Sequence, residues 1–150
     1  MRKFRFRFDT VERVRREKER EAMRVLAGAQ EALRAAFERK SALERELHAS
    51  LARREMLGAV PVGVEAFVLE ESFIAGTKRW IAQAENAIAR ARKELAKRID
   101  EYLKARRRTK VMEKLKARDL AVYRKERAKA ERKEVDDIYV MRARFKGEPA

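Results

Sequence analysis

The feature that most constrains this chain is an apolar residue that recurs at every seventh position through its second half. These residues are Phe67, Ile74, Ile81, Ile88, Leu95 and Tyr102. Small or apolar side chains occupy a companion position of the same repeat, at Thr77, Ala84, Ala91, Ala105 and Met112. A seven-residue repeat places both positions on one side of an α-helix, where they form the seam of a coiled coil. The pattern predicts one long helix that packs against a second helix.

The first half of the chain contains a less regular seam, with apolar or small residues in steps of three, four and seven. Its members are Ala22, Leu26, Ala29, Leu33, Ala36, Leu43, Leu47, Ser50 and Leu57. Lys40 and Arg54 interrupt it. The two halves are separated by residues 58–63 (Gly-Ala-Val-Pro-Val-Gly), which hold two of the five glycines and the only internal proline and therefore indicate a turn. We predict a helix over about 8–57, a turn at 58–63 and a helix over about 64–144.

Composition favours the same architecture. Of 150 residues, 43% are charged and only 7% are aromatic, which is too little apolar material for a thick multi-layer core. The 45% of hydrophobic residues argue against disorder because they are periodic. The predicted fold class is all-α, a single domain over 1–150 that forms an antiparallel two-helix coiled coil with a longer, overhanging C-terminal helix. The predicted helices are roughly 75 Å and 120 Å long at 1.5 Å per residue.

The turn also sets a register. Residues that face each other in an antiparallel hairpin have numbers with a constant sum, and a sum of 124 places large side chains opposite small ones, as for Ser50 and Ile74. The same sum places Arg54 opposite Glu70. We favour it over a sum of 117, which would compress the turn. In this register the second helix overhangs beyond about Ala121, and its apolar residues have no partner in their own chain.

The net charge of +15 is distributed unevenly. Residues 1–60 carry 16 basic and 10 acidic side chains, residues 61–103 carry 7 of each, and residues 104–150 carry 17 and 8. An antiparallel hairpin brings both basic segments to its open end. The sequence therefore predicts a neutral turn end and a basic open end and tail, an oriented surface for anionic partners.

Catalytic and metal-binding patterns are missing from the sequence. The five glycines are scattered and form no phosphate-binding loop, and one histidine (His48) without cysteine cannot build a zinc site. Asp136 and Asp137 are adjacent, so on a helix they point about 100° apart rather than toward one ion. We expect no enzymatic activity, no catalytic residue, no metal and no cofactor.

The sequence also bears on location. No apolar run approaches the ~20 residues of a membrane-spanning helix, and the first eight residues lack the apolar segment of a secretory signal. The absence of cysteine fits a reducing compartment. We expect a cytoplasmic protein.

Motifs at both ends of the chain resemble the flagellar export protein FliJ family. Those near the N-terminus are Lys3-Phe4-Arg5-Phe6-Arg7-Phe8, Val11-Glu12-Arg13-Val14-Arg15, Glu21-Ala22 and Ala29-Gln30. Those near the C-terminus are Lys114-Leu115-Lys116-Ala117-Arg118-Asp119, Tyr123-Arg124-Lys125-Glu126, Glu131-Arg132-Lys133-Glu134 and Asp136-Asp137-Ile138. The resemblance spans nearly the whole chain.

The resemblance implies a non-enzymatic stalk of the flagellar type III export apparatus, similar to the γ subunit of rotary ATPases. It implies three partners: the ring of the export ATPase FliI, whose assembly and activity the stalk promotes; the cytoplasmic part of the export gate protein FlhA; and export chaperones. The gate would hold the protein peripherally on the cytoplasmic face of the inner membrane. The residues implied for the ATPase ring are Phe8, Val11, Arg15, Tyr123, Arg124, Glu131, Ile138 and Arg142. Those implied for the gate are Phe73, Thr77, Trp80, Ala84, Leu43 and Ser50.

Other interpretations stay open at this point. Phe73 and Trp80 either widen the core or form an exposed aromatic ledge for a partner. The high charge and the run Arg106-Arg107-Arg108 would also suit nucleic acid, although 25 interspersed acids neutralise part of that charge and a hairpin is not the parallel zipper of basic-region helices. We therefore expect no specific nucleic-acid partner. A homodimeric scaffold, in which two tails cover each other, is the third interpretation.

Overall fold

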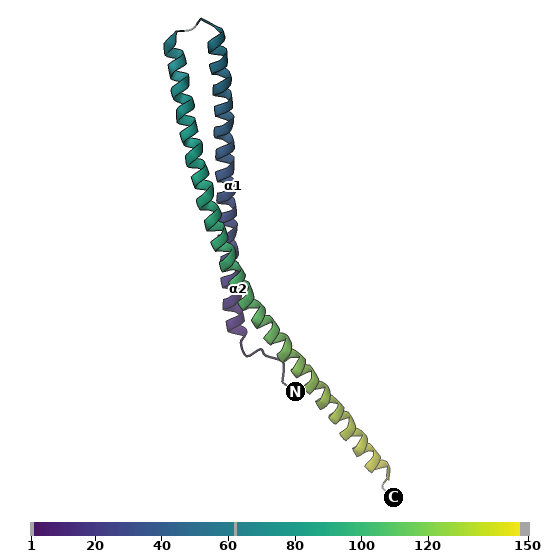
Figure 1. The fold of residues 1–150 in the computed structure, drawn as a ribbon. Coiled ribbons are helices and arrows are strands. Elements are labelled where there is room, and N and C mark those ends of the chain that lie inside the picture. Colours follow the sequence, from purple (N-terminus) through teal and green to yellow (C-terminus); the bar gives the residue numbers. More distant parts are fainter. Residues whose placement is uncertain (1, 62, 148–150) are drawn as a thin grey trace. The chain divides into compact units, whose positions relative to one another are not determined.

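Two long helices make up nearly all of the structure, a computed structural model that describes residues 2–61 and 63–147 (Figure 1). Helix α1 spans Asp9–Ala59 and helix α2 spans Val64–Gly147. The two helices pack against each other in antiparallel directions, and the all-α hairpin predicted from the seven-residue repeat is confirmed.

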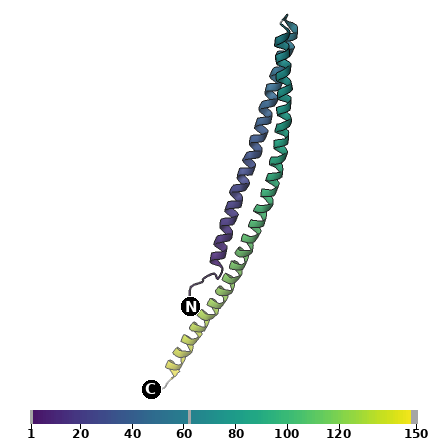
Figure 2. The same ribbon diagram turned by 90° about the vertical axis from the view of Figure 1, so that its left-hand side faces the viewer.

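The chain divides into two compact units, and each is described by itself. The turn unit comprises Arg20–Leu103, and the terminal unit comprises Met1–Glu19 with Lys104–Ala150. In the turn unit the α1 and α2 ribbons lie side by side in both Figure 1 and Figure 2.

Buried residues of the turn unit lie at the predicted seam positions. Ile74 and Ile88 are buried on α2 and Ala29 on α1, because the seven-residue repeat keeps them on the facing sides of the two helices. Near the turn the seam residues are only partly covered. Phe67 is 42% exposed, since it lies one turn from the start of α2 and no further layer covers it.

Ion pairs across the turn unit fix the register. Lys40 Nζ lies 3.3 Å from Glu85 Oε1, and Arg54 Nη1 lies 2.8 Å from Glu71 Oε1. Both pairs have residue numbers that sum to 125, which agrees with the predicted sum near 124 and excludes 117. The partner predicted for Arg54 was wrong by one position, because Glu70 pairs with Arg53 at 3.4 Å instead.

The turn needs no special glycine conformation. Gly58 belongs to the last turn of α1, and none of the glycines in the described residues has a positive φ. The Ala66 amide donates to the Gly63 carbonyl at 3.1 Å, which closes the first turn of α2. Val62, a member of the predicted turn, lies outside the described residues.

The terminal unit begins with a non-helical stretch, residues 2–8, here called the N-terminal segment. It alternates Phe4, Phe6 and Phe8 with basic residues, and this period of two is typical of extended chain rather than helix. Phe6 is buried, while the intervening Arg5 and Arg7 are exposed. The alternation therefore turns phenylalanine toward α2 and arginine toward solvent.

This segment changes where the overhang of α2 begins. Extended chain covers about 3.3 Å per residue against 1.5 Å in a helix, so the N-terminal segment reaches farther along α2 than a helical start would. Lys3 lines a hollow together with residues of α2 as far as Glu134. The predicted overhang beyond about Ala121 therefore starts too early, and the continuously exposed stretch of α2 is residues 131–147.

Candidate docking surfaces

The terminal unit carries almost all of the excess charge. Residues 1–19 and 104–150 contain 25 basic and 12 acidic side chains, a net charge of +13, against +2 in residues 20–103. The net charge therefore lies in the terminal unit, and the turn unit is close to neutral. A surface of this kind favours anionic partners and speeds their approach.

The N-terminal segment is held on α2 by aromatic contacts. The Phe4 ring lies 5.5 Å from the Tyr123 ring, and the Tyr123 hydroxyl donates to the Arg2 carbonyl at 2.8 Å. Phe6 packs edge-on against Phe8 with ring centroids 5.9 Å apart. Of the residues proposed for the ATPase ring, Tyr123 therefore packs against the N-terminal segment, and Phe8 packs within it.

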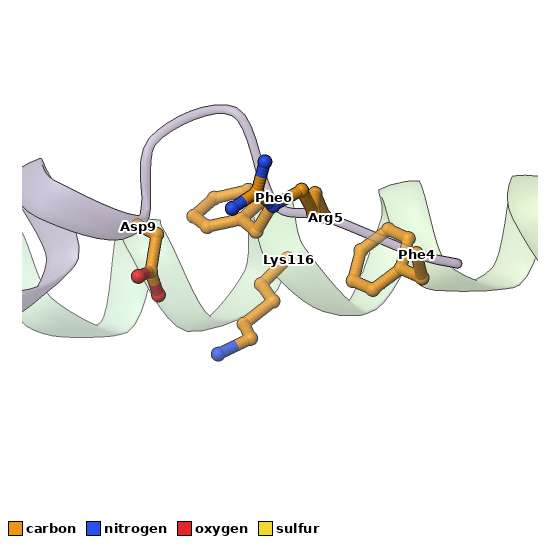
Figure 3. A pocket seen from close by; sticks show the side chains of 5 residues that line it. All are labelled: Phe4, Arg5, Phe6, Asp9 and Lys116. Carbon is orange, nitrogen blue, oxygen red and sulfur yellow. The ribbon is translucent and has the colours of Figure 1, made fainter. Parts of the chain in front are cut away.

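Figure 3 shows the hollow beside this segment, with the Lys116 side chain extending past the Phe6 ring. The hollow has a volume of about 270 Å³ and is lined by Phe4, Arg5, Phe6, Asp9 and Lys116. The Lys116 ammonium lies 5.9 Å from the Phe6 ring centroid, within reach of a cation–π interaction. One lysine thus contacts both the segment and, through Glu12, the start of α1.

Glu12 is the central charge of this region. It is 2% exposed, and Lys116 Nζ donates to its Oε2 at 3.1 Å. Arg16 Nη2 lies 2.6 Å from Oε1 as an ion pair, although this oxygen accepts no hydrogen bond within the described residues. Glu12 also lies in the first turn of α1, where the helix dipole favours negative charge.

Arg15, proposed for the ATPase ring, is engaged with α2. Its Nη1 donates to the Arg108 carbonyl at 3.2 Å, and its own carbonyl accepts from the buried Thr109 hydroxyl at 3.4 Å. One helical turn along α1, Glu19 pairs with Arg106 at 3.1 Å. The Arg15 guanidinium is therefore partly engaged in a hydrogen bond within the terminal unit, whereas Val11 is 41% exposed and available to a partner.

Four further residues proposed for the ring share one side of the part of α2 beyond Leu120, residues 121–147, here called the tail. Arg124, Glu131, Ile138 and Arg142 follow one another in steps of seven, seven and four, which keeps them within about 40° around a helix axis. Glu131 accepts from Arg127 at 2.8 Å, and this hydrogen bond raises the pKa of the Arg127 guanidinium. The structure brings these four residues together on α2, while Phe8, Val11 and Arg15 lie on the N-terminal side of the same unit.

The seam side of α2 continues into the tail without a covering helix. Ile138, Met141 and Phe145 are spaced by three and four residues, on the side of α2 that buries Thr109 and Met112 nearer the turn. Their exposed fractions are 51%, 63% and 84%. Met141 and Phe145 were not among the predicted ring residues, although the continued spacing already indicates them.

Four of the six residues predicted to bind the gate line a groove of about 370 Å³ in the turn unit: Leu43, Phe73, Thr77 and Trp80. It is bounded by Arg39, Leu43, Glu46, Ser72, Phe73, Gly76, Thr77 and Trp80. Phe73 is 46% and Trp80 53% exposed, so these aromatics form an accessible ledge rather than part of the core. The Thr77 hydroxyl donates to the Phe73 carbonyl at 2.9 Å, and Thr77 is only 3% exposed.

Three predicted gate residues, Ser50, Thr77 and Ala84, are inaccessible in this packing. Ser50 is fully buried and accepts a hydrogen bond from Arg53 at 2.9 Å, and Thr77 and Ala84 are buried in the seam. All three occupy seam positions of the repeat, which is why the helices cover them. None of these side chains can contact a partner while the helices stay paired.

Within residues 2–61 and 63–147, no group of three or more His, Asp or Glu side chains could hold a metal ion. No helix in this part of the chain is long and apolar enough to cross a membrane. His48 is exposed on α1.

Comparison with known families decides the relationship. The family described as "Flagellar FliJ protein" matches residues 4–148 of the chain. The chain belongs to the FliJ family. Membership makes it a component of the flagellar export apparatus, and the FliJ match covers the N-terminal segment, both helices and the tail alike. Searches of curated proteins and of solved structures found no match.

Proposed function

We propose that this FliJ-family chain is a non-enzymatic stalk that binds the ring of the export ATPase FliI through its terminal unit and promotes assembly and activity of the ring. The observation that supports this most is the seam side of the tail, where Ile138, Met141 and Phe145 are exposed without a covering helix. A helix face of this kind is stabilised when a partner buries it. The stalk would act through binding energy that favours one arrangement of the ring.

The experiment measures ATP hydrolysis by the cognate ATPase with and without this chain. We expect the wild-type chain to raise hydrolysis, and the variant Ile138→Ala, Met141→Ala, Phe145→Ala to lose most of the effect. The matched control removes apolar side chains of similar exposure from the other sides of the tail, as Val135→Ala, Tyr139→Ala, Val140→Ala. Equal stimulation by both variants, or full stimulation by a chain truncated after Leu120, would refute binding through the seam side.

The charged residues on the neighbouring side of the tail give a second test of the same proposal. Arg124 and Arg142 are exposed, and neither has an ion-pair partner within the described residues. Substitution of both with glutamine is expected to weaken ring binding more at low salt than at high salt, because exposed charges are screened. A loss independent of salt would argue that these side chains contribute by packing alone.

We further propose that the groove of the turn unit binds the cytoplasmic part of the export gate protein FlhA. The half-exposed Phe73 and Trp80 support this, since aromatic residues beside a hollow are typical binding hot spots. Leu43 lies on the α1 side of the same groove, so both helices contribute. The buried Ser50, Thr77 and Ala84 would act only by holding the helices together.

Binding of the isolated cytoplasmic part of FlhA to the full chain tests this proposal. Trp80→Ala is expected to weaken binding by about 2 kcal/mol or more, the scale of a hot spot. Leu69→Ala removes a more exposed apolar side chain outside the groove and is the control, with little expected change. If the two substitutions weaken binding equally, the groove is not the site.

Export chaperones are proposed as a third class of partner, and attachment to the gate would hold the chain peripherally at the cytoplasmic face of the inner membrane.

The exposed seam side of the tail also supports a second candidate function, a scaffold formed by self-association of two copies. Analytical ultracentrifugation over a range of concentrations distinguishes the stalk from the self-associating scaffold. A stalk is expected to stay monomeric, whereas a scaffold dimerises and loses this ability in the Ile138, Met141 and Phe145 variant.

A further inference from the structure

The outer side of α2 in the terminal unit carries a row of basic side chains, here called the cationic stripe. Its members are Arg107, Lys110, Lys114, Arg118, Lys125, Lys129 and Arg132. They follow one another in steps of three, four and seven, which keeps them on one side of a helix, opposite the side that buries Thr109 and Met112. All seven are exposed. At 1.5 Å per residue the stripe is about 38 Å long.

The charge of the stripe is not neutralised within the chain. Arg118 contacts Asp119 at 3.5 Å, but the other six members have no ion-pair or hydrogen-bond partner among the described residues. The acidic residues of the same stretch, Glu113, Asp119, Glu126 and Glu131, have their Cα atoms about 100° or more around the helix axis from the middle of the stripe. Along the helix axis neighbouring charges are about 4.5–6 Å apart, except between Arg118 and Lys125, where the separation is about 10.5 Å. All the other separations are well below the ~10 Å screening length at 0.1 M salt, so the charges on each side of this gap act on a ligand together.

We propose that the cationic stripe binds directly to a membrane surface rich in anionic lipids. A flat anionic surface can contact every member of a straight stripe at once, and each basic side chain near such a surface adds to the attraction. Lysines predominate in the stripe, and Val111, half exposed on the same side, is suited to the interface between headgroups and acyl chains.

Nucleic acid fits these features less well. The phosphates of a duplex wind around its axis, so a straight helix face meets them only at intervals. Single-stranded nucleic acid is bound by aromatic side chains on which bases stack, and the stripe contains none. The observations therefore favour a lipid surface.

Lipid binding would use a different side of α2 from the proposed ring contacts. Ile138, Met141 and Phe145 continue the seam side, whereas the stripe lies opposite to it. A ring lumen would surround the tail on every side, so the lipid-bound chain would be one that is not inserted in a ring. The inference concerns binding without the ATPase, and its failure would leave the proposed stalk function untouched.

The test is co-sedimentation of the full chain with vesicles of phosphatidylcholine containing about 30% phosphatidylglycerol, at about 0.1 M salt. The stripe variant replaces its six unpaired members with glutamine, at Arg107, Lys110, Lys114, Lys125, Lys129 and Arg132. The control variant replaces six exposed, unpaired basic residues of the turn unit with glutamine, at Arg45, Lys78, Arg79, Arg90, Lys93 and Lys97. Both variants lose the same net charge, and glutamine is a good helix former.

We expect the stripe variant to bind these vesicles at least about a hundredfold more weakly than wild type, and the control variant to stay within about threefold. Pure phosphatidylcholine vesicles should bind none of the three. Equal losses in the two variants would show that only net charge matters and would overturn the proposal. Absence of wild-type binding would do the same. Tighter wild-type binding to a 30-base-pair DNA duplex than to the vesicles, abolished in the stripe variant, would assign the stripe to nucleic acid instead.

Discussion

Replacing Glu12 with glutamine is expected to loosen the terminal unit and leave the turn unit unchanged. Glu12 is 2% exposed, and its carboxylate faces Lys116 at 3.1 Å and Arg16 at 2.6 Å. Glutamine keeps the size of the side chain but removes its charge and turns an amide donor toward two cations. Glu12 is the only charged residue among the buried residues in 2–61 and 63–147.

The magnitude follows from how exposed the partners are. Removing one member of a fully buried pair costs about 3–5 kcal/mol, and an exposed pair contributes about 0–1 kcal/mol. The side chains of Lys116 and Arg16 are 40% and 48% exposed, so water still hydrates them when the carboxylate is gone. We therefore expect Glu12→Gln to cost about 1–2 kcal/mol, a factor of about 5 to 30 in the local opening equilibrium.

Amide hydrogen exchange measures that equilibrium residue by residue. Protection in residues 10–19 and 105–116 should fall by about 5- to 30-fold in Glu12→Gln, while residues 70–95 keep their protection. Glu21→Gln is the matched control, because Glu21 pairs with Arg24 at 3.1 Å with both side chains mostly exposed. Its expected effect is below about 1 kcal/mol.

A double-mutant cycle completes the test. In the Glu12→Gln background, Lys116→Gln should add less than it does in wild type, because the pair has already been broken. The reasoning is refuted if Glu12→Gln and Glu21→Gln lower protection equally, or if Glu12→Gln lowers protection throughout both units.

Three further outcomes follow from the contacts. Phe6→Ala removes the buried ring of the N-terminal segment and should speed tryptic cleavage near the N-terminus about tenfold or more, whereas Phe145→Ala, at a side chain that is 84% exposed, should not. Thr109→Val should change the melting temperature little, because a methyl group of similar size replaces a hydroxyl whose acceptors are helix carbonyls. A large drop in the melting temperature would show that the hydrogen bond from Thr109 to the Ala105 carbonyl contributes to stability. Lys40→Leu adds an apolar side chain at a position where a lysine interrupts the seam. The free energy of unfolding, measured in urea, should stay equal or rise by about 1 kcal/mol despite the loss of the ion pair with Glu85. A clear decrease in the free energy of unfolding would contradict this expectation.

The sequence predicts the turn unit well because its physics is local and periodic. Ile74, Thr77 and Ile88 are buried since a repeat of seven fixes which side of a helix they occupy, whatever the partner is. The sequence does not decide whether Phe73 and Trp80 belong to the core or form an exposed ledge, for a related reason. Both residues flank the seam, and only the distance between the helices decides whether a flanking ring is covered.

The N-terminal segment shows where helical periodicity stops being informative. The alternation of phenylalanine and arginine over residues 3–8 has a period of two, so it signals extended chain, but it does not say what the phenylalanines cover. That depends on Lys116 and Tyr123, more than a hundred residues away in sequence. The importance of Glu12 escaped prediction for the same reason, since its burial requires the segment and α2 together.

The ion pairs of the turn unit select the register of the two helices, although each pair contributes little to stability. Lys40 pairs with Glu85, and sliding α2 by one heptad in either direction would preserve every seam position. One slide would place Lys78 opposite Lys40, and the other would place Arg92 there. Each slipped register replaces an attraction with a repulsion, which is how charged residues select one pairing among several with equal apolar contacts. The lysine that interrupts the seam therefore sacrifices some apolar burial and, in return, makes the register unique.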